Sequence, residues 1–150
     1  MSNENTPWIG IDLDGTLAAK DGEYVEGKIG WPIFKMCQFA KYQLGMGNRV
    51  KIYTARADNP VDVAAIKNWL LDEAGLPETR AEFNRLKSLG TPIEELEITN
   101  VKDRACVMLL DDLAYHVVEN TGEIIGLGAI TNSRHRETRL PKVVPFRVVR

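Results

Sequence analysis

Two aspartates separated by one residue, Asp12 and Asp14, are the residues of this sequence best suited to chemistry. They follow the apolar run WIGI and precede Gly15 and Thr16 in the stretch IDLDGT. Carboxylates this close raise each other's pKa unless a cation lies nearby. A solvated Asp-Gly turn would also contain such a pair, whereas a calcium loop of the EF-hand type is disfavoured because its later acidic positions are absent. The pair therefore has to be interpreted together with the other polar residues at its end of the fold.

The apolar pattern predicts the elements that position this pair. Strands are expected at 8–13, 49–54, 96–99 and 106–112, of which the first and the last should be buried and the third is short. Helices are expected at 33–44, from Asn59-Pro60 to about 72, and at 78–89. Strands that alternate with helices predict an α/β fold with a mainly parallel sheet flanked by helices. Two further elements are expected later in the chain: a hairpin around Thr121-Gly122 and an edge strand within 142–149.

Ligands of parallel sheets gather at the carboxyl ends of the strands. The polar residues that follow the four predicted strands are Asp12 and Asp14, Thr54, Lys102, and Asp111 and Asp112. Magnesium is typically held by carboxylates together with a substrate phosphate, which would relieve the repulsion among these aspartates. The ammonium of Lys102 and the hydroxyl of Thr54 would then help to neutralise a phosphoryl group. The sequence thus predicts a magnesium site for phosphoryl transfer.

Four motifs in this order resemble those of the haloacid dehalogenase-like (HAD) superfamily of magnesium-dependent phosphohydrolases. The motifs are DLDGT at 12–16, YTAR at 53–56, the lysine of NVKD, and LLDD ending at Asp112. The resemblance covers about residues 8–120 and extends to small HAD proteins frequent in phage and prophage genomes. It implies a Rossmann-like sheet and a phosphatase that requires Mg²⁺.

The resemblance also implies the catalytic roles. Asp12 would attack phosphorus and form an aspartyl-phosphate. Asp14 would protonate the leaving oxygen and later deprotonate the hydrolytic water, and Gly15 would permit the sharp turn after the pair. Lys102 would offset charge on both Asp12 and the phosphate.

The remaining site residues follow from the same resemblance. Thr54 would hydrogen-bond a phosphoryl oxygen, helped by backbone N–H groups near Leu13 and Ala55. The expected metal ligands are the side chains of Asp12 and Asp111, the backbone carbonyl of Asp14, and Asp112 either through water or by orienting Lys102. For Arg56 two interpretations stay open, a contact to the leaving group of the substrate and a structural ion pair.

The spacing of the motifs leaves no room for an independent cap domain. The segments 16–50 and 56–102 are short, and most of each is needed for the predicted helices. A relatively open site favours a phosphate on a large molecule, such as a nucleic-acid end, unless a second subunit closes it over a small metabolite. A phosphate- or nucleic-acid-binding module without turnover is the alternative from another class.

Composition sets the remaining expectations. The 150 residues, 44% hydrophobic and 27% charged, are typical of a single domain over 1–150 that has no membrane-spanning segment. Two cysteines and no leader-like N-terminus favour a reducing cytoplasmic setting. The tail at about 134–150 holds six basic residues and one acidic residue. It would bind an anionic partner such as nucleic acid, or pair with the acidic body or a second subunit.

Overall fold

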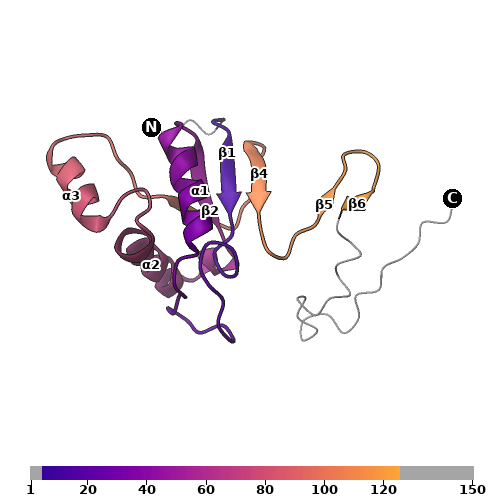
Figure 1. Cartoon of the computed structure of the whole chain (residues 1–150), viewed down its shortest axis with the longest axis horizontal. Helices are drawn as coiled ribbons and strands as arrows, with labels where there is room; N and C mark the ends of the chain where they lie inside the picture. Colours follow the sequence, from indigo (N-terminus) through magenta and orange to yellow (C-terminus); the bar gives the residue numbers. More distant parts are fainter. Residues whose placement is uncertain (1–4, 126–150) are drawn as a thin grey trace. The chain divides into compact units, whose positions relative to one another are not determined.

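The computed structural model describes residues 5–125 of the chain (Figure 1). The chain divides into two compact units, Met1–Asp112 and Leu113–Arg150, so the expected single domain over 1–150 stays a prediction. The basic tail at 134–150 and the late edge strand at 142–149 lie outside the described residues.

A four-stranded parallel sheet forms the centre of the first unit. Its strands are β1 (Trp8–Ile11), β2 (Arg49–Tyr53), β3 (Glu97–Thr99) and β4 (Cys106–Leu110), in the order β3-β2-β1-β4. Every neighbouring pair is parallel. The predicted α/β fold with a mainly parallel sheet is therefore confirmed, and its arrangement is consistent with a Rossmann-like fold.

Three α-helices accompany the sheet, at positions close to the predicted ones. They are α1 (Phe34–Gly45), α2 (Pro60–Trp69) and α3 (Arg80–Ser88), and a π-helical turn (Leu70–Ala74) continues α2. The side chain of Asn59 accepts hydrogen bonds from the backbone N–H groups of Val61 and Asp62, and this starts α2. Thr79 caps α3 in the same way, because its side chain accepts a hydrogen bond from the backbone N–H of Glu82.

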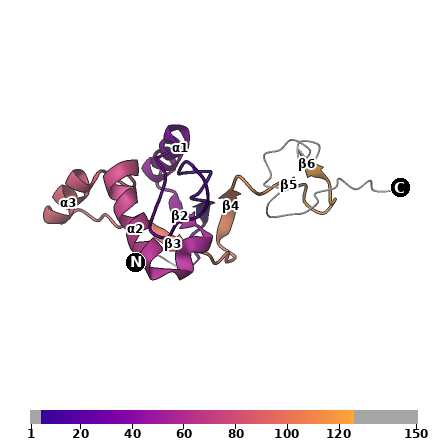
Figure 2. The ribbon, with the colours of Figure 1, turned by 90° about the horizontal axis from the view of Figure 1, so that it is seen from below.

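The core lies on one face of the sheet because side chains alternate along a strand. Ile9 and Ile11 of β1 stand in register with Val50 and Ile52 of β2. These side chains belong to one buried cluster that also contains residues of α1 and α2, among them Cys37, Ala40, Ile66 and Trp69. Both helices thus pack on the same face, and Figure 2 shows α1 lying over the strands.

The opposite face carries polar groups as well as aromatic rings. The Lys51 ammonium lies 4.6 Å from the centroid of the Trp8 ring and 3.9 Å from Asp103. Asp103 also accepts a hydrogen bond of 2.7 Å from the indole N–H of Trp8. The segment between β3 and β4 therefore crosses this face without a helix.

The prediction that residues 106–112 form a buried strand is only half right. The strand exists, but Val107 and Met108 are 65% and 47% exposed. The reason is the position of β4 at the edge of the sheet, where its only strand neighbour within the described residues is β1. An apolar sequence does not distinguish an edge strand from a central one.

The described part of the second unit is a hairpin. Its strands β5 (His116–Val117) and β6 (Ile124–Ile125) pair antiparallel, which confirms the hairpin predicted around Thr121-Gly122. Gly122 has φ +74°, as its turn position requires. Across residues 5–125, no helix combines the length and the apolar character that a bilayer span requires.

Candidate active site

The candidate site lies where the order of the strands reverses. The chain runs from β1 to β2 to β3 in one direction across the sheet and then returns to place β4 on the other side of β1. Ligands of open α/β sheets bind in the crevice at such a reversal, outside the carboxyl ends of the strands. Asp12 directly follows β1, and Asp111 directly follows β4. The two strand ends that carry the predicted aspartates are thus neighbours.

Three carboxylates meet at this point. Oxygen atoms of Asp12, Asp111 and Asp112 lie within 4.8 Å of one another. Burial raises the pKa of Asp12 to about 8, and the charges of Asp111 and Asp112 and a hydrogen bond with Asp112 act in the same direction. The Leu13 backbone N–H acts in the opposite direction. A hard divalent cation is the group that would let all three ionise, and carboxylate oxygens are the ligands that Mg²⁺ prefers.

Thr16, a residue to which the sequence pattern assigned no role, joins the two strand ends. Its hydroxyl accepts a hydrogen bond of 3.0 Å from the Asp112 backbone N–H. It donates to the carboxylates of Asp112 at 3.3 Å and Asp12 at 3.5 Å. The position of Thr16 within the DLDGT motif was the available signal. Outer partners of this kind orient carboxylates that bind a metal.

Gly15 is required both by its backbone and by its neighbour. Its φ is +89°, a conformation that L side chains rarely adopt, and a Cβ at this position would lie 2.6 Å from an oxygen of Asp112. The expectation that Gly15 permits the turn after the aspartate pair is therefore confirmed. The close approach of Asp112 is an additional reason for glycine.

Asp14 is not part of the group of three carboxylates and pairs with Arg56 instead. The guanidinium Nε and Nη2 donate to the two oxygens of Asp14, each at 2.8 Å. Arg56 is only 9% exposed, and its Nη1 donates to Asp62 at 3.1 Å. The structure therefore contains the ion pair that was one of the two interpretations of Arg56. A contact between Arg56 and a leaving group stays a prediction.

Three of the residues expected to bind phosphate lie within two positions of Asp14 or Arg56 in the chain: Leu13, Thr54 and Ala55. The Thr54 hydroxyl is buried and accepts a hydrogen bond of 3.2 Å from the Arg56 backbone N–H. Ala55 begins a short 3₁₀ helix (Ala55–Asp58) just beyond β2. The carbonyl of Leu13 accepts hydrogen bonds from the backbone N–H groups of Leu17 and Ala18, which closes the loop 13–18 after β1. Their contact with phosphate stays a prediction.

Lys102 is not joined to the three carboxylates. It is exposed, and the groups that shift the pKa of Asp12 are Asp111, Asp112 and the Leu13 backbone. Its neighbour Asp103 is held by Trp8 at the start of β1, the strand end opposite to the site. The catalytic role of Lys102 therefore stays a prediction, and it requires the side chain to reach the crevice when substrate binds.

No protein-family model, curated protein or solved structure matches the chain. The resemblance to the HAD superfamily therefore stays a prediction that rests on the four motifs.

Proposed function

We propose that the chain is a magnesium-dependent phosphomonoester hydrolase that works through an aspartyl-phosphate. The observation that carries this proposal is the meeting of Asp12, Asp111 and Asp112 at the reversal of the strand order. Asp14, two residues from Asp12, adds a fourth carboxylate outside this group, and it is paired with the Arg56 guanidinium. Two differently placed carboxylates are what a nucleophile and a proton carrier require.

The reaction proceeds in two displacements. In the first, an oxygen of Asp12 forms a bond to phosphorus while the bond to the leaving oxygen breaks, and that oxygen takes a proton from Asp14. In the second, water attacks the phosphorus of the aspartyl-phosphate and gives its proton to Asp14. The bond between Asp12 and phosphorus then breaks, and inorganic phosphate leaves.

Asp12, Asp111 and Asp112 would hold the metal, and Thr16 would keep two of them in place. When bound, Mg²⁺ supplies positive charge that lowers the pKa of Asp12 and offsets charge on the phosphoryl oxygens. The buried hydroxyl of Thr54, next to Asp14 and Arg56, would donate to a phosphoryl oxygen. Lys102 would add a charge from the segment after β3.

The substrate we propose is a phosphate on a large molecule, with a nucleotide or nucleic-acid terminus as the first candidate. The support is the small amount of structure that the described segments 12–33 and 54–96 insert between the strands. Residues 12–33 form a loop with isolated bridges, and the elements between β2 and β3 are the 3₁₀ helix Ala55–Asp58, α2, the π-helical turn and α3. This is consistent with a site that has a minimal cap or none.

Phosphate release tests the proposal. Purified protein with Mg²⁺ should hydrolyse p-nitrophenyl phosphate, and a panel of nucleotides, DNA 3′-phosphates and sugar phosphates should identify the preferred class. Asp12→Asn should abolish turnover while circular dichroism shows an intact fold. Retained turnover in Asp12→Asn would eliminate the nucleophile. Salt-sensitive binding of DNA without any hydrolysis would favour a binding module, and hydrolysis of sugar phosphates alone would favour a small-metabolite enzyme.

A further inference from the structure

Asp62 is a buried carboxylate to which the reaction proposed above assigns no part. It lies in the first turn of α2 and is 1% exposed. It accepts three hydrogen bonds: from the Tyr24 hydroxyl at 2.5 Å, the Gly27 backbone N–H at 2.8 Å and Arg56 Nη1 at 3.1 Å. Burial alone would raise the pKa of Asp62, but these three donors outweigh it and hold the pKa below its usual value. Asp62 is therefore a charged group that three hydrogen-bond donors stabilise.

Arg56 lies between Asp62 and Asp14 and uses a different edge for each. Nε and Nη2 bond both oxygens of Asp14, and Nη1 bonds Asp62. The Tyr24 ring covers the guanidinium, with the central carbon of that group 4.8 Å from the ring centroid. A planar guanidinium can meet two carboxylates and a ring at once, whereas a lysine ammonium presents no such fork. The direction in which Asp14 points is thus fixed through Arg56.

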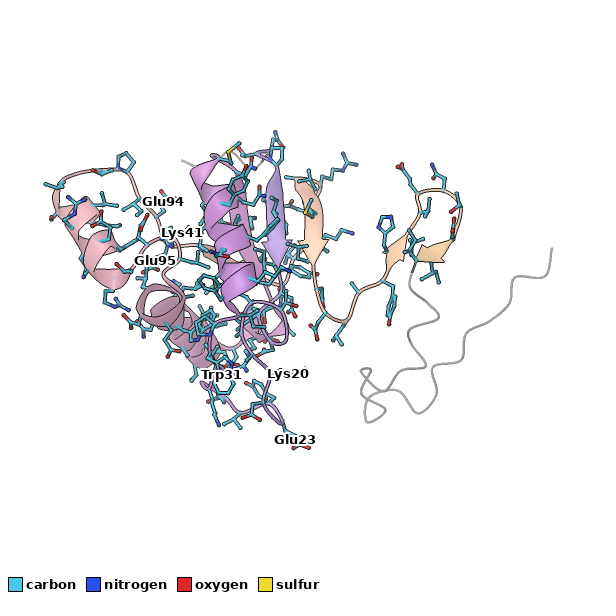
Figure 3. The ribbon with its side chains drawn as sticks, in the orientation of Figure 1. Lys20, Glu23, Trp31, Lys41, Glu94 and Glu95 are labelled. Atoms are coloured by element: carbon cyan, nitrogen blue, oxygen red, sulfur yellow. The ribbon has the colours of Figure 1, made fainter. Side chains whose placement is uncertain are left out.

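The Asp62 carboxylate also holds the segment 20–33, which follows the aspartate pair and its turn in the chain. This segment extends beyond the carboxyl end of β1 (Figure 1), and Figure 3 shows Glu23 at its outer tip, with Lys20 and Trp31 nearer to its base. Tyr24 and Gly27 attach it to Asp62, and Glu26 accepts a hydrogen bond of 3.0 Å from Asn59. All of these anchors lie in the first turn of α2 or just before it.

The geometry points to Asp62 as a positioning residue for the reaction, an inference that rests on the proposed function. Asp62 holds Arg56 against Asp14, and it holds Tyr24 over Arg56. The placement of segment 20–33 and the orientation of Asp14 therefore depend on each other. Both oxygens of Asp14 bond Arg56, so proton transfer through Asp14 requires one of these bonds to open. While it opens, Asp62 keeps Arg56 in place, and Asp14 returns to the same orientation after each turnover.

Steady-state kinetics of Asp62→Asn test this inference. Asparagine keeps the size and an oxygen acceptor but loses the charge that holds Arg56. We expect kcat to fall about tenfold to a hundredfold, as for a misplaced catalytic group, while KM changes far less. The matched control is Asp72→Asn, which removes an exposed partner of Arg80 away from the site and should leave kcat unchanged. A folded Asp62→Asn protein with the wild-type kcat would overturn the inference.

Tyr24→Phe keeps the test decisive if Asp62→Asn does not fold. It removes only the hydroxyl that bonds Asp62, and Tyr24 is 56% exposed, so the fold should tolerate the change. A lower kcat with little change in KM supports the inference. An unchanged kcat contradicts it.

Amide hydrogen exchange separates this inference from the proposed function because it needs no turnover. If Asp62 couples the two regions, Asp14→Asn should speed exchange in segment 20–33, including at Gly27, although neither Tyr24 nor Gly27 has a described contact with Asp14. Asp72→Asn should leave that exchange unchanged. Slow exchange retained in Asp14→Asn would overturn the coupling, whereas faster exchange in a chain that hydrolyses no phosphomonoester would support it while the proposed function fails.

Discussion

Magnesium binding should release close to one proton per ion at neutral pH, because Asp12 has to ionise to become a ligand. Its pKa of about 8 without a metal means that about a tenth of the molecules carry an ionised Asp12 at pH 7 and about a hundredth at pH 6. Binding at pH 7 should therefore release about 0.9 proton, and the apparent affinity should fall about tenfold between pH 7 and pH 6. Above pH 8 the affinity should level off.

The raised pKa of Asp12 also determines how the free energy of unfolding changes with pH. A carboxyl whose pKa is raised on folding stabilises the fold most fully when protonated, so this contribution is present below the ordinary value of 3.8 and is lost as the pH rises to about 8. In the metal-free protein, the free energy of unfolding should thus fall across this range. A fixed concentration of Mg²⁺ should restore part of this free energy at pH 8 and little at pH 5, where the affinity is lower.

Isothermal titration calorimetry in two buffers of different ionisation enthalpy measures the proton release directly. The titrations are repeated at pH 6, 7 and 8, and Asp12→Asn serves as the control because it has no proton to lose at this position. Asp72→Asn, with an exposed carboxylate away from the site, should behave like the wild type. Equal affinity at pH 6 and pH 8 with no proton release would refute the argument that Asp12 is the group that ionises.

Three further variants test the packing of the site and the core. Gly15→Ala places a Cβ 2.6 Å from Asp112 at φ +89°. We expect calorimetry to show weaker Mg²⁺ binding, and the free energy of unfolding to fall by about 1–3 kcal/mol in denaturant titrations. Gly22→Ala, with a similar φ of +79° but open space around it, should bind normally, and weak binding in both variants would contradict the role of the Asp112 contact. Thr16→Val should lower Mg²⁺ affinity about 10–100-fold and Thr16→Ser should retain it, whereas equal losses would exclude the hydroxyl as the cause. Ile52→Ala, at a fully buried position, should lower the free energy of unfolding by about 2–5 kcal/mol in urea titrations. Val61 is 53% exposed, and a loss in Ile52→Ala no larger than the loss in Val61→Ala would contradict the described core.

The elements were predictable from the sequence because their signals are local. Asn59 and Pro60 mark the start of α2 through a side-chain cap and a fixed φ. Ile9 and Ile11 are two residues apart in a strand, so both side chains lie on the core face. The meeting of the aspartates followed from one further rule, since carboxyl ends of parallel strands share an edge.

Features that depend on side-chain partners far along the chain were not predictable. The order of the strands decides that Val107 is exposed, and no local pattern reports that order. Arg56 meets Asp14, which is 42 residues away in the chain, only after β1 and β2 pair, so its two interpretations had equal support in the sequence. The placement of Lys102 depends in the same way on how the segment after β3 crosses the sheet.

The edge position of β4 connects the metal to the folding of the chain. Thr16 and Asp112, which meet across the two strand ends, are 96 residues apart, so the cluster of negative charge arises only when β4 pairs with β1. Pairing over such a separation is slow to form, and an exposed edge strand is among the first elements to open. A cation that binds Asp12 and Asp111 together would therefore slow the release of β4. Magnesium should thus stabilise the pairing of β4 with β1. Its removal should raise the rate of local opening at β4 before the opening rate of the rest of the core changes.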